Sequence, residues 1–377
     1  MTVLIFLIVL AVLIFVHELG HFIFARLCGI RVDAFALGFG PKLFSWKSGE
    51  TTYGVNLIPF GGYVKIFGEN PDAESLTGPD STRSFVNKSR WQQVIVLAAG
   101  VFFNFVFAAL LYVGIFSTGV TATADGFQKY SSYFENQRIM ITYVAPDSPA
   151  DKAGIKAGDI VTGIKKHGER SNPVVILLNQ ENGTESIESI QNSISASKGE
   201  PITIQFIRNK EVTSVDVIPV SGLVEGKYAI GISMDNVVDV RLPFFISIKE
   251  GIHYTFNMIR DTAIGLYSFV AGIFKGSSHF SDISGPVGIA GIVGDAAGLG
   301  FTYLLMITAL ISINLGVINL IPFPALDGGR ILFVLIESII RRRISPTFSN
   351  VVNTLGFGLL MILMVVITYK DIANLVK

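Results

Sequence analysis

Residues 3–27, VLIFLIVLAVLIFVHELGHFIFARL, decide the fold of this chain. The run is apolar except near its end, and it is longer than the ~20 residues that a helix needs to cross a ~30 Å hydrocarbon core. His17, Glu18 and His21 place three ionisable side chains within it. Such groups are costly at membrane depth unless they pair with one another or coordinate a metal. The stretch is therefore predicted to be a transmembrane helix that carries a functional site.

The spacing His17-Glu18-x-x-His21 predicts a metal site. Positions i and i+4 of a helix share one face, so both imidazoles can reach one ion. Glu18 can reach a water molecule at that ion without being a ligand, which is the arrangement of zinc metalloproteases. The alternative is a polar contact of the two histidines with a neighbouring helix. The remaining histidines are expected to be solvated side chains: His167, His253 and His279.

The composition predicts a polytopic membrane protein. Of the 377 residues, 50% are apolar and only 15% are charged, whereas soluble domains carry about 25% charged residues. Three further apolar stretches, near residues 94–116, 301–321 and 355–369, approach membrane-spanning length. The expected fold class is a polytopic α-helical membrane protein with about four transmembrane helices, and the lipid bilayer is one partner. The formal net charge is zero, which gives no reason to propose nucleic acid as another.

The orientation follows from the placement of basic residues. The first stretch is not expected to be a secretory signal, because no basic residue precedes it and no small-residue cleavage site follows it. Basic residues instead gather after the first span and between the last two, at Arg26, Arg31, Lys42, Lys47, Arg83, Lys88, Arg90 and Arg341–Arg343. The positive-inside rule places both loops in the cytoplasm. Residues from about 117 to 300 then face outward.

The outward-facing segment predicts an inserted domain. Short β-branched runs near residues 139–144, 159–164, 201–207 and 213–217 accompany one helical stretch near 186–197. This pattern is typical of a compact α+β domain. Residues 243–274 carry apolar and charged side chains at helical spacing, which predicts a helix on the membrane surface or against the bundle. The predicted domains are a first transmembrane core half (1–116), the inserted domain (125–222), a linker with the amphipathic helix (223–300) and a second core half (301–377).

A second motif supplies a candidate third metal ligand, which a catalytic zinc requires. It reads Asn319-Leu-Ile-Pro322-Phe-Pro324-Ala-Leu-Asp327-Gly328-Gly329. The two prolines must break the third span, and non-helical backbone at membrane depth is tolerated only where it is buried in protein or lines a cavity. The break therefore indicates a site, with Asp327 as the candidate ligand. Alternatively, Asp327 is a simple N-cap of the helix predicted over residues 330–340.

Together these motifs resemble the site-2 protease family of intramembrane zinc metalloproteases, in particular the bacterial branch that includes the regulator of sigma-E protease. The resemblance covers nearly the whole chain. It implies that His17, His21 and Asp327 bind Zn²⁺ and that Glu18 activates the attacking water. It also implies that Asn319 holds substrate backbone or the developing oxyanion.

Further segments resemble features of the same family. Residues 59–65 resemble a membrane-dipping β-hairpin that pairs with extended substrate, which implies substrate contacts by Gly61, Gly62, Tyr63 and Val64, although an ordinary Gly-Gly turn is the alternative. Residues 148–160 resemble the signature of a PDZ domain in its permuted bacterial form, which implies a peptide ligand or a role as a size filter. The chain departs from the family in having room for one PDZ-like domain instead of two. It also has Val101 where proline is usual, while the matching Asn104 is expected to tie helices together.

The predicted function is zinc-dependent hydrolysis of peptide bonds within or next to the transmembrane segments of single-span membrane proteins. Family analogy adds regulated intramembrane proteolysis, with anti-sigma factors or signal-peptide remnants as substrates. The expected location is the bacterial cytoplasmic (inner) membrane, with the PDZ-like domain outside and the active site toward the cytoplasm. The first alternative is a non-catalytic membrane PDZ scaffold, which would not need Glu18. The second is a metal transporter, which would need polar residues along a continuous path.

Overall fold

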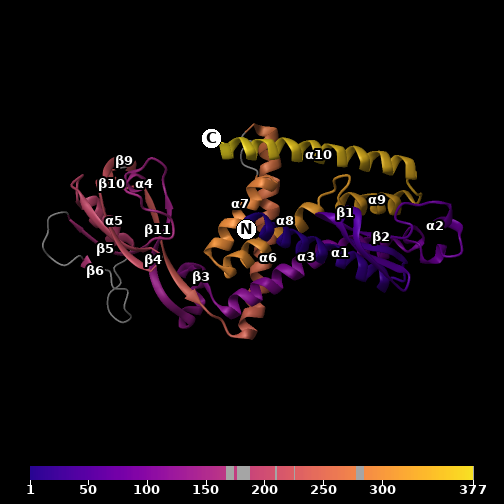
Figure 1. Cartoon of the computed structure of the whole chain (residues 1–377), viewed down its shortest axis with the longest axis horizontal. Coiled ribbons are helices and arrows are strands. Elements are labelled where there is room, and N and C mark those ends of the chain that lie inside the picture. Colours follow the sequence, from indigo (N-terminus) through magenta and orange to yellow (C-terminus); the bar gives the residue numbers. More distant parts are fainter. Residues whose placement is uncertain (167–173, 176–186, 209, 225, 277–283, 377) are drawn as a thin grey trace. The chain divides into compact units, whose positions relative to one another are not determined.

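The computed structural model describes residues 1–166, 174–175, 187–208, 210–224, 226–276 and 284–376. The chain divides into a membrane unit, Met1–Ile115 with Phe244–Lys377, and an inserted unit, Phe116–Pro243. The membrane unit contains, among the described residues, four helices long and apolar enough to cross a bilayer. They are α1 (Thr2–Leu27), α3 (Arg90–Thr118), α8 (Phe301–Asn319) and α10 (Pro346–Val376) (Figure 1). The prediction of a membrane protein with about four spanning helices is confirmed.

Two of these helices begin well before their apolar stretches. Helix α3 starts at Arg90 and α10 at Pro346, where the apolar runs were expected to start near residues 94 and 355. Proline suits the first helical turn, because its fixed φ fits a helix and its missing N–H would have no intrahelical partner there. The apolar window therefore marks the part of each helix that fits the bilayer, and the helices extend beyond it.

The membrane unit also contains shorter and amphipathic helices. Helix α6 (Phe244–Lys275) agrees with the helix predicted over residues 243–274. The shorter helices include α2 (Ala73–Thr77), α9 (Asp327–Ile340) and α7 (Pro286–Leu299). The sequence did not predict α7. Its 14 residues are apolar apart from Asp295 and are too few to span a bilayer. The buried carboxylate of Asp371 on α10 accepts a hydrogen bond from the Gly288 backbone N–H, 2.8 Å away in the first turn of α7.

A two-stranded element, β1 (Val32–Ser48) and β2 (Thr51–Ile66), follows α1. It is much longer than the hairpin expected at residues 59–65, and its tip lies where Ser48 pairs with Thr51. The chain bends within both strands, so residues 32–37 pair with residues 52–55 and also with residues 62–66. Residues 62–66 therefore form an edge, because the described pairing gives them a neighbour on one side only.

The inserted unit is an α+β domain, as predicted. Its main sheet has the order β3-β11-β4-β5-β7-β8, and β6 pairs with β5. The strands are β3 (Val120–Thr123), β4 (Phe134–Val144), β5 (Ile160–Lys166), β6 (Val174–Val175), β7 (Ile202–Arg208), β8 (Glu211–Val217) and β11 (Ile232–Val240). A separate hairpin joins β9 (Val220–Val224) and β10 (Lys227–Ala229), and the helices are α4 (Pro149–Lys152) and α5 (Ile187–Ala196). The buried core contains Ile139, Ile204 and Phe206 of the sheet together with Ile190 of α5. The core therefore lies between the sheet and α5.

Candidate metal centre

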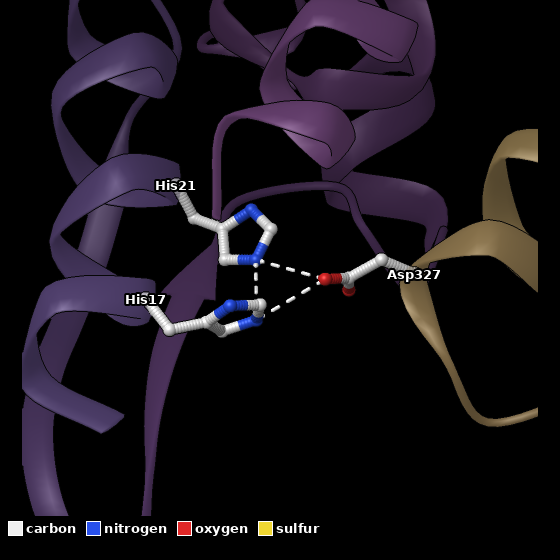
Figure 2. Close-up of side chains that lie close together, drawn as sticks. All are labelled: His17, His21 and Asp327. Atoms are coloured by element: carbon white, nitrogen blue, oxygen red, sulfur yellow. Dashed lines mark hydrogen bonds and ion pairs between the residues drawn. The ribbon is translucent and has the colours of Figure 1, made fainter. Parts of the chain in front are cut away.

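Helix α1 presents two imidazoles on one face, as the spacing predicted. His17 and His21 are both buried, and their Nε2 atoms lie 3.2 Å apart. Figure 2 shows the two rings one turn apart and directed toward the same point. Polar groups at membrane depth are costly without partners, so two imidazoles with facing nitrogens need a common partner.

That partner comes from the other end of the chain. Oδ2 of Asp327 lies 3.1 Å from Nε2 of His17 and 3.3 Å from Nε2 of His21 (Figure 2). Asp327 is the first residue of α9, and the N-cap position belongs to Leu326, which makes no side-chain capping bond. Asp327 is therefore not a simple N-cap. Its carboxylate is directed at the two histidines instead.

The break between α8 and α9 explains how Asp327 reaches this point. The segment folds back so tightly that a Cβ on Gly328 would lie 2.3 Å from the Ile321 carbonyl oxygen. A Cβ on Gly329 would lie 2.2 Å from the Phe323 carbonyl oxygen. Both distances are below van der Waals contact, so glycine is required at both positions for the loop to rest on the first turn of α9. The prolines end α8, and the glycines let the chain return.

Helix α3 fixes the other side of each imidazole. Nδ1 of His21 lies 2.9 Å from the Val96 carbonyl oxygen, and Nδ1 of His17 lies 3.1 Å from the Asn104 side-chain amide. The histidines therefore do make the helix–helix contacts that were considered as an alternative, but with Nδ1, which leaves Nε2 facing Asp327. The two helices can come this close because residue 100 is glycine. A Cβ at that position would lie 2.3 Å from Nε2 of His21.

The three facing atoms fit a zinc ion. Donor atoms about 2.0–2.1 Å from a tetrahedral zinc lie roughly 3.3–3.4 Å from one another. The three separations here are 3.1, 3.2 and 3.3 Å. Oδ2 of Asp327 is buried and has no hydrogen-bond donor in the described part of the chain. Two imidazole nitrogens and one carboxylate oxygen are a donor set that zinc accepts, with a fourth position left for water or substrate.

Glu18 lies between this cluster and the edge of the sheet. Its carboxylate is close to the Val64 backbone N–H. A Cβ on Gly62 would lie 2.8 Å from Ile14 Cγ2 and 3.6 Å from Glu18 Cγ, so β2 rests against the metal-site helix. The structure thus brings together His17, His21, Asp327, Glu18 and the residues 62–64.

Other predicted residues make different contacts. Tyr63 stacks on Phe39, with ring centroids 6.3 Å apart. Asn319 is the last residue of α8, and no hydrogen bond joins it to the cluster among the described contacts. His253 is exposed on α6, while His167 and His279 lie outside the described residues.

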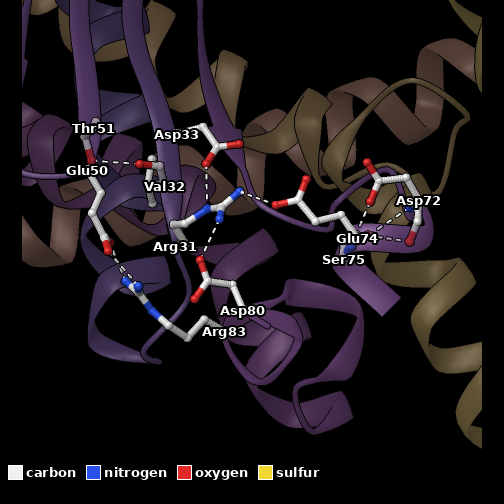
Figure 3. Close-up of polar contacts among 10 residues, drawn as sticks. All are labelled: Arg31, Val32, Asp33, Glu50, Thr51, Asp72, Glu74, Ser75, Asp80 and Arg83. Atoms are coloured by element: carbon white, nitrogen blue, oxygen red, sulfur yellow. Dashed lines mark hydrogen bonds and ion pairs between the residues drawn. The ribbon is translucent and has the colours of Figure 1, made fainter. Parts of the chain in front are cut away.

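A charged network holds the loop beneath the sheet. Arg31 bonds Asp33 at 2.9 Å and Asp80 at 2.7 Å, and its guanidinium lies 3.6 Å above the Phe67 ring. Figure 3 shows Glu74 reaching the same guanidinium and Arg83 pairing with Glu50. These contacts join the start of β1 to the segment that leads into α3. They therefore tie β1 to the segment before α3.

Sequence reasoning missed the closest supports of the site. Gly100 and the Val96 carbonyl lie within an apolar span whose pattern does not show which face meets α1. The available signal was Asn104, a polar residue in the same span that is fully buried. On α10, Oδ1 of Asn353 accepts a hydrogen bond from the Ala325 N–H at 3.2 Å. Nothing in the local sequence marks that contact.

Four membrane-length helices and a histidine–histidine–aspartate cluster beside a glutamate define a class, a membrane protein with a metal site suited to hydrolysis. The model of peptidase family M50 matches residues 5–363. A Clostridium perfringens protein whose name includes the words "zinc metalloprotease" is 38% identical over 363 residues, covering 96% of this chain and 95% of that protein. Zinc metalloprotease RasP of Geobacillus kaustophilus is 32% identical over 432 residues, covering 97% and 96%.

The chain therefore belongs to peptidase family M50, the site-2 protease family, and it is a zinc metalloprotease of a bacterial membrane. The predicted resemblance, the enzyme class and the zinc cofactor are confirmed. The non-catalytic scaffold and the metal transporter are not retained.

Proposed function

We propose that this protein hydrolyses peptide bonds within or next to the transmembrane segments of single-span membrane proteins, as in regulated intramembrane proteolysis. His17, His21 and Asp327 hold the zinc, and Glu18 is the general base. One observation carries the proposal: residues more than three hundred positions apart bring three ligand atoms within 3.3 Å of each other. Two of the three residues lie in a helix suited to a bilayer, so the peptide bond is proposed to reach the site at membrane depth.

The residues divide the chemistry among them. When bound, zinc supplies a Lewis acid that polarises the scissile carbonyl and lowers the pKa of a water molecule toward about 7. Glu18 adjoins His17 in sequence and takes the proton from this water, then delivers it to the leaving amine. Asn319 is proposed to hold substrate backbone or the developing oxyanion from the end of α8, a role suited to an amide donor.

The edge at residues 62–66 supports a route for the substrate. A transmembrane helix must be extended before a nucleophile reaches its carbonyls, and an edge strand captures extended backbone through main-chain hydrogen bonds. The Val64 N–H points to Glu18. A substrate strand added beside Gly61, Gly62, Tyr63 and Val64 would therefore place its peptide bonds next to the general base.

The inserted unit is proposed to be a PDZ-like domain on the outer face of the membrane, with the metal site toward the cytoplasm. A groove of about 300 Å³ lies between Ile194 of α5 and the stretch from Tyr228 to Met234. Gly231, at φ +83°, lies at this groove, and a Cβ there would be 2.4 Å from Ser148 Cβ in the PDZ-like signature. A groove between a helix and a strand suits an extended peptide end.

Cleavage of single-span reporter proteins by the purified full chain tests the proposal. Glu18→Gln should keep its zinc and lose activity by about 10²–10⁴-fold, the usual contribution of a general base. Asp327→Ala should lose zinc and activity together. Glu211→Gln, an equivalent change on the exposed start of β8, is the control and should match wild type. Cleavage by Glu18→Gln at the wild-type rate would refute the role of Glu18, and full zinc content in Asp327→Ala would refute the ligand set.

A further inference from the structure

The side chain of Asn104 lies against the proposed metal site. It is fully buried in α3, and its amide nitrogen lies 3.1 Å from Nδ1 of His17. Its amide oxygen is also buried and has no hydrogen-bond partner among the described residues. A buried acceptor without a donor costs about 1–3 kcal/mol, so the protein gains if the oxygen finds a donor.

The donor follows from the chemistry of His17. A neutral imidazole carries one N–H, and a ring that binds metal through Nε2 must carry its proton on Nδ1. His21 already meets this condition, because the Val96 carbonyl oxygen beside its Nδ1 can only accept. At His17, an Nδ1–H facing the amide N–H₂ would set two donors against each other. Turning the amide of Asn104 by 180° exchanges its two ends within the same volume and puts Oδ1 beside Nδ1–H.

We propose that Asn104 is a positioning residue whose side-chain oxygen accepts the His17 Nδ1–H and so fixes the tautomer and ring orientation that bind zinc. The inference rests on the proposed role of His17 as a ligand. It assigns Asn104 a task beyond tying helices together. Partners of this kind typically contribute 10–100-fold to metal affinity.

A second contact of Asn104 separates this role from helix packing. The Asn104 backbone carbonyl oxygen accepts a hydrogen bond from the Ser312 hydroxyl on α8, at 2.8 Å. Ser312 is fully buried. Ser312→Ala therefore removes a tie between α3 and α8 and leaves the His17 contact in place. It is the matched control for a structural role.

The test measures zinc affinity of the full chain in detergent by competition with a chelator, with the thermal unfolding midpoint as a check on folding. Asn104→Leu, which removes both amide ends, should weaken zinc binding by about 10–100-fold. Asn104→Asp, which offers only acceptors, should bind zinc at least as tightly as wild type. Ser312→Ala should lower the unfolding midpoint without weakening zinc binding. With Co²⁺ in place of zinc, visible absorption should keep its tetrahedral intensity in Asn104→Asp and lose it in Asn104→Leu.

Several outcomes would overturn the inference. They are unchanged zinc affinity in a folded Asn104→Leu, a loss in Asn104→Asp as large as in Asn104→Leu, or an equal loss in Ser312→Ala. If Asn104→Leu does not fold, Asn104→Asp decides alone, because it keeps zinc only if Asn104 acts as an acceptor. His17→Ala distinguishes a failure of the proposed ligand set from a failure of the role given to Asn104. Zinc retained in His17→Ala would refute the proposed ligand set, whereas zinc lost in His17→Ala but kept in Asn104→Leu would refute only the role of Asn104.

Discussion

Replacing Gly100 by alanine adds one methyl group to α3 at the point where it meets the metal site. That carbon would lie 2.3 Å from Nε2 of His21 and 2.8 Å from Cε1 of His17. Ordinary van der Waals contact begins at 3.4 Å, so the His21 ring would have to retreat by about 1.1 Å. Both rings are buried, and His21 is held on its other side by Val96. The ring therefore leaves its place facing Asp327.

The size of the effect follows from the tolerance of metal sites. Ligand distances hold within about 0.2 Å, and a 1 Å misplacement at an active site can reduce the rate by about 10²-fold. Gly100→Ala should therefore lose zinc affinity and proteolysis by at least about 100-fold. Helix propensity acts in the opposite direction, because alanine favours a helix over glycine by roughly 0.5–1 kcal/mol. The chain should still fold.

Gly114, on the same helix, provides the matched control. A Cβ there meets nothing within 4 Å, so Gly114→Ala gains the same helix propensity without a clash. Zinc content by metal analysis and cleavage of a single-span reporter should be at wild-type levels in Gly114→Ala and strongly reduced in Gly100→Ala. Equal zinc content and equal rates in the two variants would show that α3 does not pack against His17 and His21 as described.

Three further changes test the surroundings, with hydrogen exchange as the common measurement. Ala325, two residues before Asp327, has φ +75°, a conformation that glycine adopts more easily than alanine. Ala325→Gly should therefore stabilise the loop by about 1 kcal/mol without loss of zinc. Faster exchange in the loop would contradict this. Arg208→Ala should destabilise β5 and β7 by about 3 kcal/mol, because the buried Asp159 carboxylate, 2.6 Å from Arg208, loses its charged partner. The control is Arg260→Ala at an exposed ion pair, which should change stability by less than about 0.5 kcal/mol. Burial opposes ionisation of Asp239, but hydrogen bonds from Arg138, Thr121 and Asn136 outweigh it and keep the pKa of Asp239 below its ordinary value. The resulting stabilisation of β11 is complete above the unfolded pKa of about 3.9 and is lost as pH falls below it, so wild type should lose protection there and Asp239→Asn should not.

The helix with the two histidines was predictable from local residue spacing. Helix α7 and the strand pairing were not, because they depend on packing between distant residues. The i, i+4 relation of His17 and His21 is a property of any helix, so the sequence alone placed both rings on one face. Helix α7 escaped prediction because its apolar run is shorter than a span, contains Asp295 and is separated from α8 by Gly300 alone. The sequence showed only part of this hairpin, because the Gly-Gly pair at residues 61–62 resembles a turn, whereas in the structure Gly62 lies within a longer strand and pairs with Leu37. Pairing partners far apart in sequence decide such cases.

The same distinction separates the ligands from their supports. Asp327 was predictable because two prolines break the third span, and an irregular segment at membrane depth must be buried in protein or line a cavity, which indicates a site. Asn353 was not, because its contact with the Ala325 N–H depends on how α10 approaches that loop. Side-chain type identified what can bind zinc, while helix approach decides what holds the ligands in place.

Small residues at the helix crossings therefore decide whether the separate parts of this site can approach one another. A Cβ on Gly20 would lie 2.4 Å from the Ala99 carbonyl oxygen, and one on Gly356 would lie 2.6 Å from Pro324 Cβ. The first contact lets α3 reach both histidines, and the second lets α10 brace the loop that carries Asp327. Helices in a bilayer gain little hydrophobic free energy from associating, so close backbone approach supplies much of their attraction. Enlarging either glycine would separate the two halves of the proposed zinc site while leaving every proposed ligand in the chain.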